Sequence, residues 1–142
     1  MNDKTITLYN AYKDGKEIYW NRTAVRGCEY KYSSVRTTGQ NGAIIYTPLL
    51  TVVIPVSADI AGKKYIDAFS YEKLAPEEVT GYFTFNVANK HDVIVAGECD
   101  KEITDSYKIT DLQKEIEKSG TIISLDDNTD VKRLKHWKVV CK

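Results

Sequence analysis

Short runs of alternating apolar and polar residues dominate the chain, and they are rich in Val, Ile, Thr and Tyr. Runs of this kind, separated by Gly, Asn, Asp and Lys, are typical of β-strands rather than helices. Residues 5–10 alternate in this way, and the pair Asp14-Gly15 predicts a tight turn before a second strand at residues 17–20. The first part of the chain therefore predicts a β-hairpin.

The alternation resumes at residues 28–32, and we interpret Gly27, directly before them, as a β-bulge. The strongest apolar β run covers residues 50–54 and is followed by Pro55. Proline lacks the N–H group that a central strand needs for its ladder of hydrogen bonds. We therefore expect this strand to end at Pro55 or to lie at the edge of a sheet.

The second half of the chain predicts two further strand pairs and one helix. Residues 82–87 and 92–98 are expected to form a hairpin, and residues 121–125 and 134–141 a last strand pair in which Trp137 is the largest anchor.

The helix is expected at residues 110–118, with Thr110 as its cap and Gly120 just past its end. Leu112 and Ile116 form a single apolar pair on one side, which predicts a short helix on the surface of a sheet.

These elements together predict one mainly β domain over residues 1–142, a small antiparallel β-barrel or sandwich with one short surface helix at residues 110–118. A chain of 142 residues and 16.1 kDa can bury about two thirds of its surface, which is enough for a core without disulfides. Cys28, Cys99 and Cys141 are odd in number and widely spaced. We expect them to be packed thiols of a protein made in a reducing compartment.

The charge balance argues against two classes of partner. Twenty Lys and Arg offset twenty Asp and Glu, so the formal net charge is zero. No long-range field then attracts phosphate backbones or anionic lipids. The longest apolar run also falls well short of the roughly 20 residues of a membrane span. We expect neither a specific nucleic-acid partner nor a membrane partner.

Motifs for catalysis, metal binding and nucleotide binding are missing from the sequence. The two histidines, His91 and His136, are not spaced as zinc ligands, and the glycines do not form a phosphate-binding loop. Asp126, Asn128 and Asp130 match the first three ligands of a calcium loop, but the Gly and Glu required later in that loop are absent. The sequence predicts no catalytic residue, no metal ligand and no cofactor, and hence no enzyme.

The candidate functional surface is a partner interface in the middle of the chain. Glycines at positions 39 and 42 predict a long hairpin tip or mobile loop over residues 33–42. Nearby apolar residues would be unusual in a free loop but suit a segment that another subunit covers. The candidate interface residues are Val35, Arg36, Thr37, Ile44, Ile45 and Tyr46.

Short stretches spread along nearly the whole chain carry a family resemblance. They are Thr7-Leu8-Tyr9-Asn10, Tyr19, Arg22-Thr23 before Gly27, Val52-Val53-Ile54-Pro55-Val56, Lys64-Tyr65-Ile66, Phe83-Thr84, Asp92-Val93-Ile94-Val95 with Gly97-Glu98, Ile109-Thr110-Asp111-Leu112 and His136-Trp137-Lys138-Val139. In their order and spacing the chain resembles an uncharacterised family of small proteins encoded among the head and connector genes of tailed phages and prophages of Firmicutes. The layout is also similar to that of phage head-closure proteins, small β-barrels that form a ring under the portal.

The resemblance implies a non-enzymatic virion protein, made in the bacterial host cytoplasm, that acts as a head-completion or head–tail connector subunit through ring assembly. Its partners would be further copies of itself, the portal or an adaptor, and tail proteins. An alternative is a monomeric β-barrel binding module whose exposed tyrosines stack on a sugar or a single-stranded nucleic acid. A third is a hydrolase that combines His91 or His136 with Asp92 or Asp130.

Overall fold

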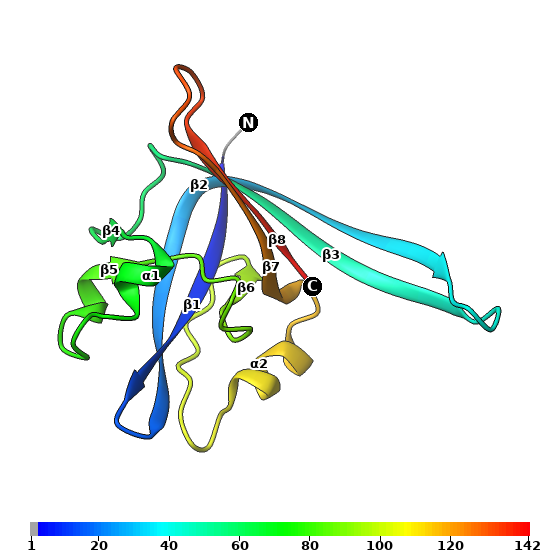
Figure 1. Ribbon diagram of the computed structural model, residues 1–142, viewed down its shortest axis with the longest axis horizontal. Coiled ribbons are helices and arrows are strands. Elements are labelled where there is room, and N and C mark those ends of the chain that lie inside the picture. The colour runs from blue at the N-terminus through cyan, green and yellow to red at the C-terminus, as the bar shows by residue number, and fades with distance from the viewer. Residues whose placement is uncertain (1–2) are drawn as a thin grey trace.

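The computed structural model describes residues 3–142, and half of the chain is in β-strands. In chain order the elements are β1 (Lys4–Asp14), β2 (Glu17–Thr38), β3 (Ile44–Pro55), β4 (Lys64–Tyr65), α1 (Ala68–Tyr71), the 3-10 turn η1 (Val79–Gly81), β5 (Tyr82–Phe83), β6 (Val93–Ala96), α2 (Ile109–Glu115), β7 (Ser119–Asn128) and β8 (His136–Cys141). Figure 1 shows a small body from which one long hairpin projects to the side.

Six strands form the body in the order β1-β2-β3-β8-β7-β6. Every neighbouring pair is antiparallel, and β6 pairs back with β1, so the ring of strand pairings closes. Strands β4 and β5 form a separate parallel pair beside this ring. The prediction of a mainly β, antiparallel domain with one short surface helix is confirmed.

Two of the three predicted hairpins are present. Strands β1 and β2 pair along their length, β7 pairs with β8, and β3 ends at Pro55 as expected. The hairpin predicted between residues 82–87 and 92–98 was wrong. Strand β5 pairs instead with β4, and β6 lies between β1 and β7.

At Thr84, just after β5, a side chain takes the place of a neighbouring strand. The amide of Asn10 donates a hydrogen bond from Nδ2 to the carbonyl oxygen of Thr84 at 2.7 Å, and its Oδ1 accepts one from the Thr84 N–H at 3.2 Å. Both backbone groups of this buried residue are therefore satisfied without a second strand.

The bulge expected at Gly27 is present in β2. Thr5 pairs with Arg26 and Lys4 pairs with Cys28, so Gly27 is the extra residue, and its φ of 87° suits glycine. Just before the bulge Asn21, Thr23 and Val25 are buried; after it the buried residue is Cys28. The bulge therefore switches which side chains of β2 face the inside of the body.

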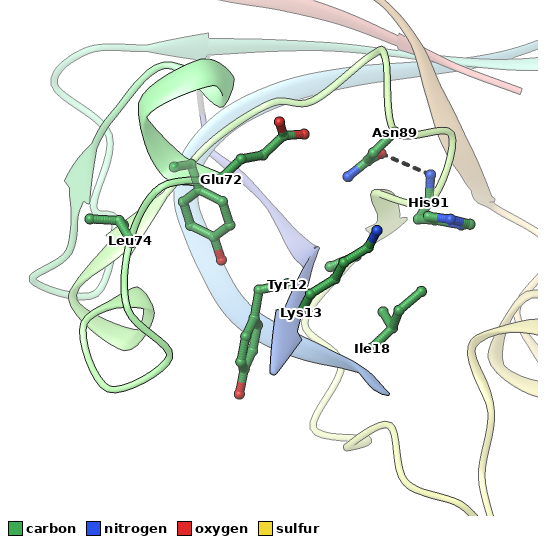
Figure 2. Close-up of a pocket in the computed structure, with 9 residues that line it drawn as sticks. Tyr12, Lys13, Ile18, Glu72, Leu74, Asn89 and His91 are labelled. Carbon is green, nitrogen blue, oxygen red and sulfur yellow. Dashed lines mark hydrogen bonds between the residues drawn. The ribbon is translucent and has the colours of Figure 1, made fainter. Parts of the chain in front are cut away.

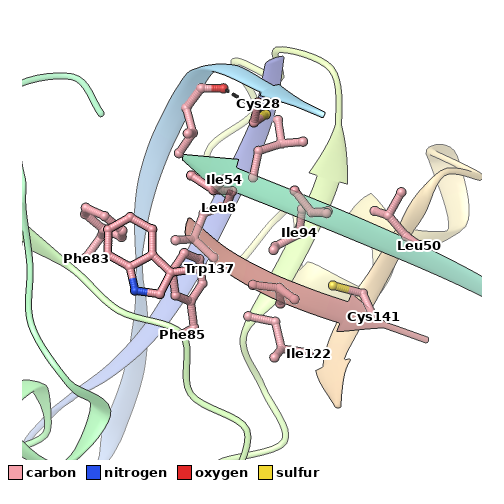
Figure 3. Packing of buried hydrophobic residues seen from close by; sticks show 14 residues of the cluster. Leu8, Cys28, Leu50, Ile54, Phe83, Phe85, Ile94, Ile122, Trp137 and Cys141 are labelled. Atoms are coloured by element: carbon pink, nitrogen blue, oxygen red, sulfur yellow. Dashed lines mark hydrogen bonds between the residues drawn. The ribbon is translucent and has the colours of Figure 1, made fainter. Parts of the chain in front are cut away.

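The core lies inside the ring of strands (Figure 3). Aliphatic side chains from β1, β2, β3, β6, β7 and β8 fill it, and an aromatic group covers one side of them. This group consists of Tyr65, Phe83, Phe85 and Trp137, with the Tyr65 and Trp137 ring centres 4.8 Å apart. Trp137 is 6% exposed, so its expected burial is confirmed.

Helix α2 packs on the outer face of β1 and β6. Its fully buried residue Leu112 belongs to a second cluster with Tyr9 and Val93. The helix begins and ends earlier than expected: Lys108 rather than Thr110 is its N-cap residue, and Asp111 in the first turn accepts a 2.9 Å hydrogen bond from the Lys108 N–H.

Gly120 lies in β7 rather than at the end of the helix. A Cβ atom there would lie 2.9 Å from the backbone nitrogen of Lys142, so the residue permits a close contact between strands.

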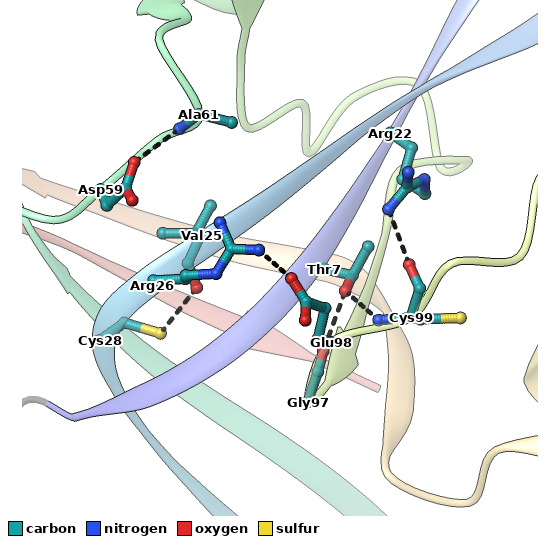
Figure 4. Close-up of polar contacts among 10 residues, drawn as sticks. All are labelled: Thr7, Arg22, Val25, Arg26, Cys28, Asp59, Ala61, Gly97, Glu98 and Cys99. Atoms are coloured by element: carbon teal, nitrogen blue, oxygen red, sulfur yellow. Dashed lines mark hydrogen bonds and ion pairs between the residues drawn. The ribbon is translucent and has the colours of Figure 1, made fainter.

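Polar contacts fix the segment that follows β6 against the body (Figure 4). The Thr7 hydroxyl donates to the Gly97 carbonyl at 2.9 Å and accepts from the Cys99 N–H at 2.8 Å. Arg22 donates to the Cys99 carbonyl at 2.9 Å, and Arg26 forms an ion pair with Glu98. These contacts connect residues 97–99 to both β1 and β2.

Candidate functional site

The projecting hairpin has no neighbouring strand on either side among the described residues. The last residue of β8, Cys141, pairs with Leu50, and beyond this point β3 pairs only with β2, from Ser33–Leu49 to Thr38–Ile44. We call residues 33–49 the arm and the other described residues the body. Six residues per strand at about 3.3 Å each extend the arm by roughly 20 Å, and Figure 1 shows it pointing away from the body.

Of the two forms expected for residues 33–42, a long hairpin tip or a mobile loop, the structure has the hairpin, with a shorter tip than expected. Strand β2 continues to Thr38, and the connection is limited to residues 39–43. Branched side chains on one strand, Val35 and Thr37, lie opposite Thr47 and Ile45 on the other, a composition that favours extended backbone. The two glycines are confined to the turn.

One face of the arm continues the inner face of the body. Side chains alternate along β3, so Ile44 and Tyr46 lie on the same side as Leu50, which is 1% exposed inside the body. On the arm nothing covers that side, and Ile44 and Tyr46 are 57% and 67% exposed. Arg36 lies opposite Tyr46 on this face.

The opposite face of the arm is apolar as well. Val35 and Ile45 lie there and are exposed. A two-stranded ribbon with apolar residues on both faces is marginally stable alone in water and is typical of a segment that a partner covers. All six residues predicted for an interface lie together on the arm; they are Val35, Arg36, Thr37, Ile44, Ile45 and Tyr46.

Sequence reasoning missed a groove on the body (Figure 2). Its volume is about 470 Å³, and it lies between the β1–β2 turn and the segment that follows α1. Both apolar and charged side chains line it, and no single stretch of sequence contains them. The lining residues are Ala11, Tyr12, Lys13, Ile18, Tyr71, Glu72, Leu74, Asn89 and His91. The only sign of the groove in the sequence was the pair Ile18-Tyr19 near the Asp14-Gly15 turn, of which Ile18 lines the groove.

Beside the groove lies a buried carboxylate, Asp92. Its Oδ1 accepts hydrogen bonds from the Ala11 N–H and the Asn89 amide, both at 2.9 Å, and its Oδ2 accepts one from the Asn10 amide at 2.7 Å. Burial raises the pKa of Asp92, and these hydrogen bonds partly oppose that rise. Because Asn10 and Ala11 belong to β1, the carboxylate fixes the start of β6 to this part of β1.

The other residues considered for chemistry are dispersed. His91 is exposed at the groove, whereas His136 lies at the start of β8 and contacts Asn128 at 3.2 Å. Burial raises the pKa of Cys28 to about 11 and that of Cys141 to about 12, so both thiols stay protonated at neutral pH. Within residues 3–142, no group of His, Cys, Asp and Glu is arranged to hold a metal ion.

A half-buried amine, Lys63, donates all of its hydrogen bonds within the fold. Its Nζ donates to Asn21 Oδ1, to the Arg22 carbonyl and to Thr23 Oγ1 at 2.7–2.9 Å. Burial, with a smaller contribution from Arg22, lowers its pKa to about 8. Because all three N–H groups are bonded to β2, this amine holds the segment before β4 in place.

No helix among residues 3–142 has the length and apolar character to cross a membrane.

A family model matches the chain over residues 1–142, and it is described as Family of unknown function (DUF6751). No curated protein and no solved structure matches the chain. Because the family model covers the whole chain, the protein belongs to the family of unknown function DUF6751.

Proposed function

We propose that the protein is a non-enzymatic structural subunit that works by assembly, with the arm as its contact to neighbouring subunits. One observation carries the proposal: the arm exposes Ile44 and Tyr46 on one face and Val35 and Ile45 on the other. Apolar side chains on both faces of a projecting ribbon gain stability when another protein buries them.

The family resemblance described above suggests which assembly this is. We propose a head-completion or head–tail connector subunit of a tailed phage, in contact with further copies, the portal or an adaptor, and tail proteins. A ring subunit meets its neighbour through two different patches, and closure of the ring fixes the copy number. A projecting arm and a formal net charge of zero, which adds no long-range repulsion between copies, suit this role.

Deletion of residues 37–42 in a phage that encodes the protein tests the proposal. We expect the purified variant to stay folded, because a hairpin tip adds little to the core, and the phage to yield no DNA-filled heads joined to tails. A matched control deletes residues 129–134, the turn between β7 and β8 that Figure 1 shows on another side of the body. Normal particle yields from a folded arm deletion would refute the proposal. An equal loss of particle yield from the arm deletion and the control deletion would refute it as well.

One observation favours the alternative, a binding module for a sugar or a single strand. Tyr12 lines the groove with a partly exposed side chain, and an aromatic ring of this kind can stack on a sugar or a base. The rings of Tyr12 and the exposed Tyr19 are also 5.9 Å apart. Titration of the wild-type chain with oligosaccharides and with oligothymidylate, followed by intrinsic fluorescence, separates the two functions. Saturable binding that Tyr12→Ala abolishes would favour the alternative.

A further inference from the structure

We propose that the groove on the body is the docking site for the arm of a second copy of this chain. This inference rests on the proposed function and adds the acceptor surface to it. The contact would be head-to-tail, because the donor and the acceptor are different patches of one molecule. Such a contact closes into a ring or continues as a filament, depending on the rotation between copies.

The two surfaces lie near opposite ends of the molecule. Figure 1 shows the arm tip at one end of the longest axis and the β1–β2 turn, which borders the groove, toward the other. Strand β2 connects them directly, since Ile18 at its start lines the groove and Thr38 at its end lies at the arm tip. An arm that points away from its own groove can reach the groove of a neighbour without folding back.

The groove offers apolar contacts to the arm. Ile18 on the β1–β2 side and Leu74 on the α1 side line it together with the rings of Tyr12 and Tyr71. A volume of about 470 Å³ is within the usual range of about 300–1,000 Å³ for binding pockets and suits a few side chains rather than a whole domain. The exposed Tyr46 and Ile44, two residues apart on one face, are a ligand of that size.

Charge also matches between the two surfaces. Arg36 is the only charged residue of the arm, and it lies opposite Tyr46 on the face that continues the inner face of the body. Two oppositely charged side chains line the groove, Lys13 from β1 and Glu72 after α1; Glu72 is its only carboxylate, is exposed and lies on the same side as Leu74. Arg36 would be attracted by Glu72 and repelled by Lys13, so the charges favour one orientation of the arm. An ion pair at the rim of an apolar contact sets orientation more than affinity. A second copy thus supplies both the apolar residues and the opposite charge.

The test uses two variants that each keep one of the two surfaces. An arm variant carries Ile44→Ser, Ile45→Ser and Tyr46→Ser and retains the groove; a groove variant carries Ile18→Arg and retains the arm. Ile18 is 41% exposed, so its replacement should leave the fold intact, and Ile123→Arg on β7, where the isoleucine is 46% exposed, is the matched control. Circular dichroism and thermal unfolding establish that all three variants are folded.

Sedimentation velocity up to millimolar concentration provides the readout. We expect the wild type and Ile123→Arg to associate, and each of the other variants alone to show a Kd raised by at least about tenfold. Mixed together, the arm variant and the groove variant should form a 1:1 dimer that grows no further, because one intact arm then meets one intact groove. As a second signature, Arg36→Glu and Glu72→Arg should each weaken association, and the double variant should restore it.

The outcomes separate this inference from the proposed function. Association that the arm variant loses but Ile18→Arg keeps would exclude the groove as acceptor and leave the arm as the assembly surface. A wild-type chain that stays monomeric at millimolar concentration would also overturn docking between copies, while the particle assay with the 37–42 deletion would still decide the proposed function. Association that the arm variant retains would count against both.

Discussion

Strands β2 and β3 run through both the body and the arm, yet their side chains lie in opposite environments in the two regions. Leu50 and Tyr46 lie on the same face of β3, and their exposed fractions are 1% and 67%. The alternation is uninterrupted between them; at Leu50 both β2 and β8 pair with β3, whereas at Tyr46 only β2 does. Whether a side chain is buried thus depends on the neighbouring strands. The face of β3 that is buried in the body is exposed on the arm.

The difference has a physical consequence for function. In the body, each apolar side chain contributes to the free energy of unfolding because its burial removes it from water. On the arm, the same kind of side chain stays in contact with water in the isolated chain, so its apolar surface remains available for binding. Substitutions in the two regions should therefore act on different quantities, stability in the body and association on the arm.

The largest effect is expected for Trp137→Ala. The indole packs against Tyr65, Phe83 and Phe85 and is 6% exposed, so the substitution should lower the free energy of unfolding by about 3–5 kcal/mol. Urea or thermal unfolding measures the change. Trp137→Phe is the control, since it keeps a ring and removes an indole Nε1–H that has no hydrogen-bond partner in the fold. An unchanged melting temperature for the alanine variant would contradict the comparison.

The sequence predicted the elements of the body better than their partners. Alternation and turn residues located β1, β2, β7 and β8, because these strands pair with a neighbour in the chain. The same reasoning failed for the pairing of residues 82–87 with 92–98, although β5 and β6 lie within these two stretches. In the first stretch Thr84 and Asn86 are buried as well as Phe83 and Phe85. A stretch buried on both sides is not a half-exposed strand, and nothing local indicates that Asn10, far away in the chain, bonds to its backbone.

The arm was predicted in position but not in form. Its apolar residues were visible in the sequence, but two glycines suggested a long hairpin tip or a mobile loop over residues 33–42, whereas β2 continues to Thr38 and the connection is short. The groove could not be predicted, because its lining comes from β1, β2, α1 and the residues before β6. Only the folded chain brings Ile18 and Leu74 to one place.

An intermediate effect is expected at Asp92, where the body depends on a polar contact rather than on apolar packing. Asp92→Asn keeps the size of the side chain but places an N–H donor against the donors of Asn10, Ala11 or Asn89. Loss of such a buried hydrogen bond costs about 1–3 kcal/mol. Thermal unfolding at neutral pH measures this loss, and Asp130→Asn, at an exposed position, is the control with no expected change.

The pH dependence of the same variant has a defined sign. The folded pKa of Asp92 is raised above its ordinary value. At pH values between the ordinary pKa of the unfolded chain and the raised pKa of the folded chain, the folded chain binds more protons than the unfolded chain. The free energy of unfolding therefore decreases as the pH rises through this interval. The wild type therefore gains stability on acidification that Asp92→Asn cannot gain, and the difference in melting temperature between them should widen from neutral to acidic pH. A difference that narrows would contradict a raised pKa.

The smallest effect on stability is expected for Tyr46→Ala, and it gives the sharpest comparison between the two regions. Because the ring is 67% exposed, its removal should change the free energy of unfolding by no more than about 0.5 kcal/mol. Leu50→Ala, on the same face of the same strand, should cost about 2–5 kcal/mol. Urea unfolding of both variants measures this contrast, and sedimentation of Tyr46→Ala should show weakened association with the fold unchanged. Equal destabilisation by the two variants would mean that the body already covers this part of the arm, and Tyr46 would then not be available to a partner.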